Sequence, residues 1–75
     1  MMREGDQDLA IADLTQAIGL DPDLVSAYAL RGELYLARRD FDRAIVDLEA
    51  TLRLDPNHPG VEDRLVLARM LRDIN

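Results

Sequence analysis

The chain has 75 residues, a net charge of −6, 48% hydrophobic residues and no cysteine. This length allows one small domain, and the lack of cysteine excludes disulfides and thiolate metal sites. An acidic chain without a basic cluster is a poor match for nucleic acid or an anionic membrane surface. No apolar run is long enough to span a membrane and no secretory signal pattern is present, so we expect a cytoplasmic protein with neither nucleic-acid nor membrane partners.

The first predicted helix lies within residues 5–22, where apolar side chains recur at helical spacing. Asp6 is its expected N-cap, because a carboxylate accepts hydrogen bonds from the free amides of a first helical turn. The segment Asp21-Pro22-Asp23 ends this helix, since proline disfavours helical geometry at the residue before it. Asp23 is then expected to cap the next helix.

The second predicted helix runs from about Leu24 to Arg38. Within it Tyr28, Gly32 and Tyr35 recur at helical spacing. Glycine inside a helix costs about 1 kcal/mol relative to alanine, so its presence needs a structural reason. We expect a neighbouring helix to pack against Gly32 too closely for a side chain.

The third predicted helix covers about residues 41–54, with Asp40 as its N-cap and Phe41 as its first residue. Ala44 is the small residue expected to face Gly32 across a tight helical hairpin. The connector that follows, residues 55–60, contains Pro56, Pro59 and Gly60 and ends this helix.

An internal repeat relates the first and third helices. Residues 5–23 align with residues 39–57 at an offset of 34 residues, and nine of the 19 pairs are identical. This offset falls within the range of periods of helical solenoids. The identical pairs are Asp6/Asp40, Asp8/Asp42, Ala10/Ala44, Ile11/Ile45, Asp13/Asp47, Leu14/Leu48, Leu20/Leu54, Asp21/Asp55 and Pro22/Pro56.

The fourth predicted helix spans about residues 59–74 and carries two apolar sides. Val61, Leu65 and Ala68 can pack back on the preceding helices. An ordinary surface helix needs only one apolar stripe, so the other side predicts an additional buried surface. That second set comprises Leu67, Met70, Leu71 and Ile74.

The stretch 27–56 resembles the tetratricopeptide repeat family, with about one complete repeat at residues 25–58. One departure is Thr51, where the family usually places alanine. The resemblance implies an all-α fold of antiparallel helical hairpins, a four-helix fragment of a right-handed superhelix. It divides a single domain, 1–75, into the second helix of an incomplete repeat (5–22), a complete repeat (23–56) and a capping helix (57–75). The matching positions are Tyr28, Gly32, Tyr35, Phe41, Ala44, Leu48 and Pro56.

No catalytic, metal or cofactor site is expected. His58 is the only histidine, and no second histidine or cysteine exists to complete a transition-metal site. Residues 55–66 imitate the start of a calcium loop, but Pro59 and Val66 stand where ligands are needed. No hydroxyl side chain sits in a strand-turn-helix elbow and the glycines are scattered, so catalysis is not expected either.

The resemblance also implies a groove whose inner wall is formed by the first helix of each repeat, here the second and fourth helices. Such a groove binds a protein or peptide. The wall residues would be Ser26, Ala29, Leu30, Glu33, Ala37, Asp63, Arg64, Leu67, Met70 and Leu71.

The first helix has an apolar face that a preceding helix would cover in a complete repeat, formed by Ala10, Leu14 and Ala17. We therefore expect a non-enzymatic interaction or scaffold module that binds a partner or itself through the apolar faces of the first, second and fourth helices, with a homo-oligomer as the expected state. The alternative is a peptide-binding adaptor fragment of a longer array. A third reading buries Leu30, Leu67, Met70 and Leu71 within a compact four-helix monomer.

Overall fold

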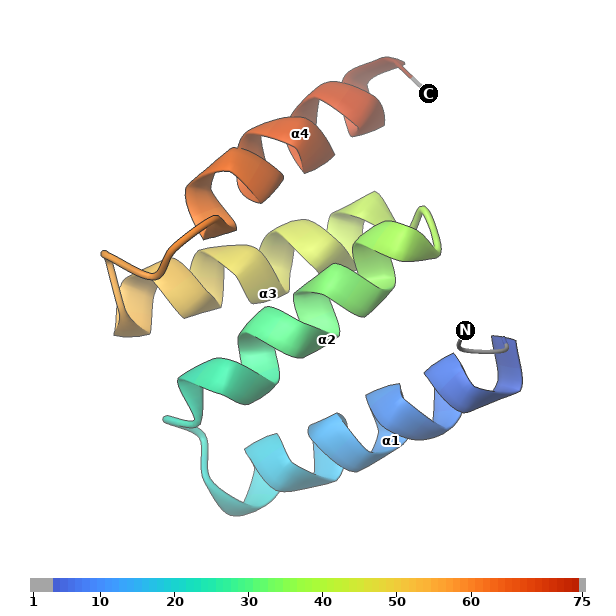
Figure 1. Cartoon of the computed structure of the whole chain (residues 1–75), viewed down its shortest axis with the longest axis vertical. Helices are drawn as coiled ribbons and strands as arrows, with labels where there is room; N and C mark the ends of the chain where they lie inside the picture. The colour runs from blue at the N-terminus through green and yellow to red at the C-terminus, as the bar shows by residue number, and fades with distance from the viewer. Residues whose placement is uncertain (1–3, 75) are drawn as a thin grey trace.

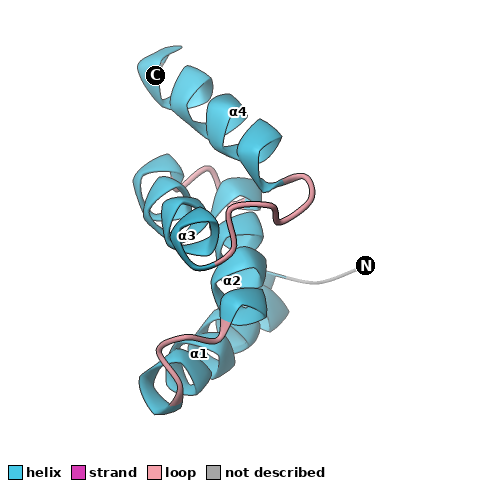
Figure 2. Ribbon diagram, turned by 90° about the vertical axis from the view of Figure 1, so that its left-hand side faces the viewer, coloured by secondary structure: helices cyan, strands magenta, loops and turns pink. Residues whose placement is uncertain are grey.

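The computed structural model describes residues 4–74 and contains α1 (Glu4–Leu20), α2 (Val25–Ala37), α3 (Phe41–Leu54) and α4 (Val61–Ile74). Consecutive helices run antiparallel and stack in chain order (Figure 1). Over the described range no strand is present. The all-α fold of helical hairpins is thus confirmed. The perpendicular view shows α1 and α4 at opposite ends of an open stack (Figure 2), and α1 packs on α2 alone.

The turn between α2 and α3 is built as the sequence predicts at Asp40. The Asp40 carboxylate accepts a hydrogen bond from the Arg43 backbone amide at 3.4 Å and so caps α3. The same residue also closes α2, because its backbone amide donates to the Tyr35 carbonyl at 2.9 Å. Arg39 between the two helices adopts a left-handed conformation with φ 63°. One tight turn therefore ends one helix and begins the next.

The other two predicted N-caps are wrong. α1 begins at Glu4, so Asp6 lies inside the helix. α2 begins after Leu24, whose side chain makes no capping hydrogen bond. The Asp21 carboxylate accepts instead from the Asp23 backbone amide at 3.1 Å. This local turn holds Asp23 outside the helix and removes it from the capping position.

The connector before α4 covers the predicted residues 55–60, but α4 begins at Val61 and not at about residue 59 as predicted. Gly60 has φ +79°, a left-handed conformation that L side chains rarely adopt. A helix that started at Pro59 would have to pass through this residue, so the regular geometry begins one residue after it. The cost of the left-handed step is small because the residue is glycine.

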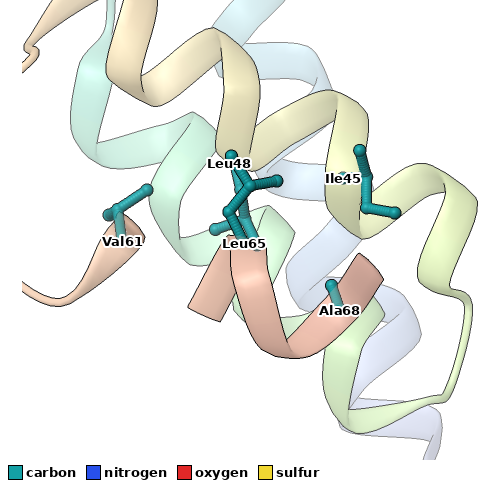
Figure 3. Close-up of a cluster of buried hydrophobic side chains, with 5 residues drawn as sticks. All are labelled: Ile45, Leu48, Val61, Leu65 and Ala68. Carbon is teal, nitrogen blue, oxygen red and sulfur yellow. The ribbon is translucent and has the colours of Figure 1, made fainter. Parts of the chain in front are cut away.

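The hydrophobic core lies between α3 and α4 (Figure 3). Leu36 and Leu52 pack against its edge while remaining partly exposed. Burial of these aliphatic side chains is the main favourable contribution to the fold. The five buried members are Ile45, Leu48, Val61, Leu65 and Ala68.

Gly32 marks a close approach of α2 and α3, as the sequence predicts, while the pairing of Gly32 with Ala44 remains a prediction. A Cβ atom at Gly32 would lie 3.0 Å from Leu48 Cδ2 and 3.3 Å from Asp47 Cβ. Gly32 therefore lies over Leu48, one helical turn beyond Ala44. Ala44 has no exposed surface.

Candidate protein-binding surfaces

An arginine on α2 joins the first three helices. Arg31 Nε donates to Asp47 Oδ2 at 2.7 Å and its Nη2 donates to Asp47 Oδ1 at 2.8 Å, a two-point ion pair with α3. Its Nη1 donates to Thr15 Oγ1 on α1 at 3.1 Å. The hydrogen bonds to Asp47 raise the pKa of Arg31 above its ordinary value, against the opposing effect of burial. The Asp47 carboxylate, 2% exposed, is thereby paired as a buried charge requires.

The two tyrosines of the sequence motif flank this arginine. The Arg31 guanidinium carbon lies 5.9 Å from the ring centre of Tyr28 and 6.0 Å from that of Tyr35. Both distances are in the range of cation–π attraction. Tyr28 Oη also donates to the Pro22 carbonyl at 2.9 Å and fixes the start of α2. These tyrosines therefore support the helix stack.

Reasoning from the sequence missed the Arg31–Asp47 pair, although one signal was present. Asp47 stands in the same helical stripe as Ala44, Leu48 and Thr51, all of which are fully buried. A carboxylate within an apolar stripe requires a cationic partner. Nothing in the helical periodicity identifies Arg31 as that partner, because it lies on another helix.

Another ion pair occurs twice along the stack, at equivalent positions of the internal repeat. Arg38 at the C-cap of α2 pairs with Asp8 on α1, and Arg72 on α4 approaches Asp42 on α3 at 3.9 Å. Both members of the second pair lie 34 residues after those of the first. The α1–α2 junction therefore reproduces a contact of the α3–α4 junction.

An apolar groove of about 410 Å³ opens between α1 and α2. Leu30 at its wall is 51% exposed. Glu33 pairs with Arg64 on α4 at 3.1 Å between Oε1 and Nε, so two of the expected wall charges neutralise each other. Exposed leucine between two helices is the usual character of a protein-binding surface. The groove is lined by Ala10, Asp13, Leu14, Leu30, Glu33 and Leu34.

A second apolar surface lies on α4, at the opposite end of the stack. Leu67 is 46% exposed and Met70 57% exposed, and Leu71 is half-buried. Val66 and Ile74 are exposed on the same helix. We call Val66, Leu67, Met70, Leu71 and Ile74 the α4 surface.

Eight residues are expected from the sequence to bind a partner, and one of them, Ala29, is buried in the structure. Ala29 is 8% exposed, so it belongs to the interior of the stack and offers no contact surface. Its neighbour Leu30 takes the exposed position on α2. The other seven are exposed or half-buried on α2 and α4: Leu30, Glu33, Ala37, Arg64, Leu67, Met70 and Leu71.

Comparison with known proteins agrees with this repeating geometry. A family model described as "Tetratricopeptide repeat" matches residues 1–64, most of the chain. The chain belongs to the tetratricopeptide repeat family. Domains of this family generally bind proteins or peptides and are non-catalytic.

Three relatives of this chain are much longer proteins. Bacteriophage adsorption protein A of Escherichia coli (strain K12) is 36% identical over 61 residues, 81% of this chain and 6% of the relative. DnaJ protein P58IPK homolog A of Oryza sativa subsp. japonica is 34% identical over 59 residues, 79% of this chain and 12% of the relative. Tetratricopeptide repeat protein 16 of Homo sapiens is 32% identical over 71 residues, 95% of this chain and 8% of the relative. The chain thus spans a small fraction of the length of these relatives.

Two further properties of the tetratricopeptide helices bear on function. In the part of the chain that the structure describes, no three His, Cys, Asp or Glu side chains are grouped so as to hold a metal ion. None of the described helices combines the length and the hydropathy needed to cross a membrane.

Proposed function

We propose that this chain is a non-enzymatic interaction module that binds a partner protein, or a second copy of itself, through the apolar faces of α1, α2 and α4. The observation that carries the proposal is the exposure of leucine at both ends of the stack. Leu30 borders the α1–α2 groove, and Leu67 belongs to the α4 surface. Contiguous exposed apolar side chains on a small domain favour an interface over a solvated surface.

Self-association is the form of this function that the α4 surface supports. Burial of about 400 Å² of apolar surface per subunit contributes roughly 10 kcal/mol of gross stabilisation, before the cost of association. This figure is comparable with the whole stability of a small domain. We therefore infer a homo-oligomer with protein as its partner, and we propose neither nucleic acid nor membrane for this acidic chain.

The alternative is a peptide-binding adaptor fragment of a longer tetratricopeptide array. The small share of each relative that the chain covers favours it. Under this alternative the wall residues of α2 and α4 would contact an extended peptide. The division of the chain at residues 22 and 56 remains a proposal, and the cytoplasmic location remains a prediction.

Light scattering on the purified chain over a range of concentrations tests the proposal. A mass above 8.5 kDa that rises with concentration, together with a rising melting temperature, supports self-association. Stabilisation by an added peptide at constant protein concentration supports the adaptor. A monomer that is stabilised by no protein or peptide would contradict both.

A further inference from the structure

The face of α1 at the groove repeats the face of α3 on which α2 lies. Ala10, Asp13, Leu14 and Ala17 precede Ala44, Asp47, Leu48 and Thr51 by 34 residues. On α3 all four side chains are covered. On α1 the Asp13 side chain is exposed and the other three are half-buried. Within residues 4–74 α1 packs on α2 alone, and the Arg38–Asp8 pair makes this contact the equivalent of the one between α3 and α4. No helix of that range therefore covers this face as α2 covers α3.

The structure shows which chemistry such a face binds. On α3 it receives a guanidinium, since Arg31 makes two hydrogen bonds to Asp47. The next residue, Gly32, has no side chain, and this lets the two backbones approach over Leu48. An arginine followed by a small residue is therefore the part of α2 that the α3 face recognises.

The repeat also indicates which kind of residue should follow the arginine and the small residue in a helix bound to α1. After Arg31 and Gly32 comes Glu33, which pairs with Arg64 on α4. The residue that stands 34 positions before Arg64 is Leu30, at the wall of the groove. A helix that lay on α1 as α2 lies on α3 would bring its third residue beside Leu30. An apolar side chain fits there, and a carboxylate does not.

The charge of the groove fits an incoming arginine. Glu33 is already engaged by Arg64. The Asp13 carboxylate forms no hydrogen bond or ion pair with any residue of the described range 4–74, so it is open to a cation. A guanidinium matches a carboxylate with two parallel hydrogen bonds.

We propose that the α1–α2 groove binds an amphipathic helix from outside this chain that carries arginine, a small residue and an apolar residue in succession. The arginine pairs with Asp13, the small residue lies over Leu14 and the apolar residue contacts Leu30. This inference rests on the proposed function and names its partner. The α4 helix of a second copy lacks the motif, because none of its arginines is followed by a small residue. The residues that follow Arg64, Arg69 and Arg72 are Leu65, Met70 and Asp73.

The test uses a probe taken from the chain itself. A fluorescein-labelled peptide of residues 23–39 with Glu33→Leu presents arginine, glycine and leucine in succession. Fluorescence anisotropy with the intact chain should show saturable binding, tighter than for the same peptide with Glu33 retained. Asp13→Asn in the chain should weaken binding about ten-fold or more, and so should Arg31→Ala in the peptide. The two changes together should weaken it no more than either alone. Glu62→Gln, which removes one carboxylate at an exposed position on α4 outside the wall residues, is the control and should leave binding unchanged.

The outcomes separate this inference from the proposed function. Undiminished binding by the Asp13→Asn chain or the Arg31→Ala peptide would overturn recognition of arginine and leave an apolar interaction module standing. Amide NMR shifts should fall on residues 10–17 and 30–34. Shifts centred on α3 would mean that the peptide had replaced α2, which also overturns the inference. No binding of the peptide would overturn it as well, whereas the proposed function is decided by light scattering together with stabilisation by added proteins or peptides.

Discussion

At the scale of single residues, two helical glycines have opposite surroundings. A side chain at Gly32 would collide with Leu48, whereas a Cβ atom at Gly19 would meet nothing within 4 Å. We expect Gly32→Leu to destabilise the fold by about 1–3 kcal/mol through overpacking. Gly19→Ala should instead stabilise it, by at most about 1 kcal/mol, because alanine favours the helix. Urea denaturation measures both, and equal effects of the two substitutions would contradict the close approach at Gly32.

The Arg31–Asp47 pair gives a second prediction at this scale. Arg31→Ala should destabilise the fold by about 3 kcal/mol, because it leaves the Asp47 carboxylate buried without its partner. Arg31→Ala combined with Asp47→Ala should cost no more than Arg31→Ala alone, since the unpaired charge is then removed. Denaturant midpoints of the single and double variants decide this. Strictly additive losses would show that the two side chains act independently.

Sequence reasoning succeeded for residues whose role depends on local geometry. Asp40 and Gly32 were predicted because capping and helix propensity act over a few neighbouring positions. Asp23 failed because the Asp21 carboxylate competes for the Asp23 amide, a choice that depends on a small energy difference. Arg31 escaped detection because its partner lies 16 residues away on another helix.

At the scale of elements, the turn between α2 and α3 holds arginine in a conformation that suits glycine. Arg39 has φ 63°, which is unfavourable by roughly 1 kcal/mol for a residue with a side chain. The equivalent position in the internal repeat is Gly5. We therefore expect Arg39→Gly to raise the free energy of unfolding by up to about 1 kcal/mol, as measured in urea. Arg39→Val, which tolerates this conformation least, should lower it.

Helix boundaries agreed with the sequence prediction where local capping and helix-ending residues are present. α3 has its predicted bounds, because Asp40 caps its start and the segment 55–56 ends it. α4 starts later than predicted because the left-handed conformation of Gly60 is set by the backbone path of the connector. The periodicity of apolar residues does not report that path.

At the scale of the whole molecule, the α4 surface predicts the assembly. Leu67→Asp with Leu71→Asp should give a soluble monomer of lower stability if this surface joins two copies, because carboxylates oppose burial there. Sedimentation or light scattering measures the mass. Val46→Asp, at an exposed position on α3, is the control and should leave the mass unchanged. An oligomer that persists in the double variant would show that the contact between copies lies on another face.

The order of the stack was predictable from the 34-residue repeat, but the exposed faces were only partly so. Leu30 and Met70 could be assigned from the register of the repeat. The burial of Ala29 could not be assigned in this way. Ala29 and Leu30 point 100° apart around the helix, and the rotation of α2 about its axis decides which of them is buried. The groove beside Asp13 depends on how α1 and α2 are placed in space, which the pattern of apolar residues does not specify.

The position of α1, which packs on α2 alone, has a consequence for motion. The core between α3 and α4 does not involve α1, so α1 can detach while the rest of the domain stays folded. Amide hydrogens of α1 should therefore exchange with solvent faster than those of α3, through an opening that costs less than global unfolding. A helix bound in the α1–α2 groove would hold α1 in place and slow this exchange. Equal protection of α1 and α3 in native-state exchange would show that the four helices open only together.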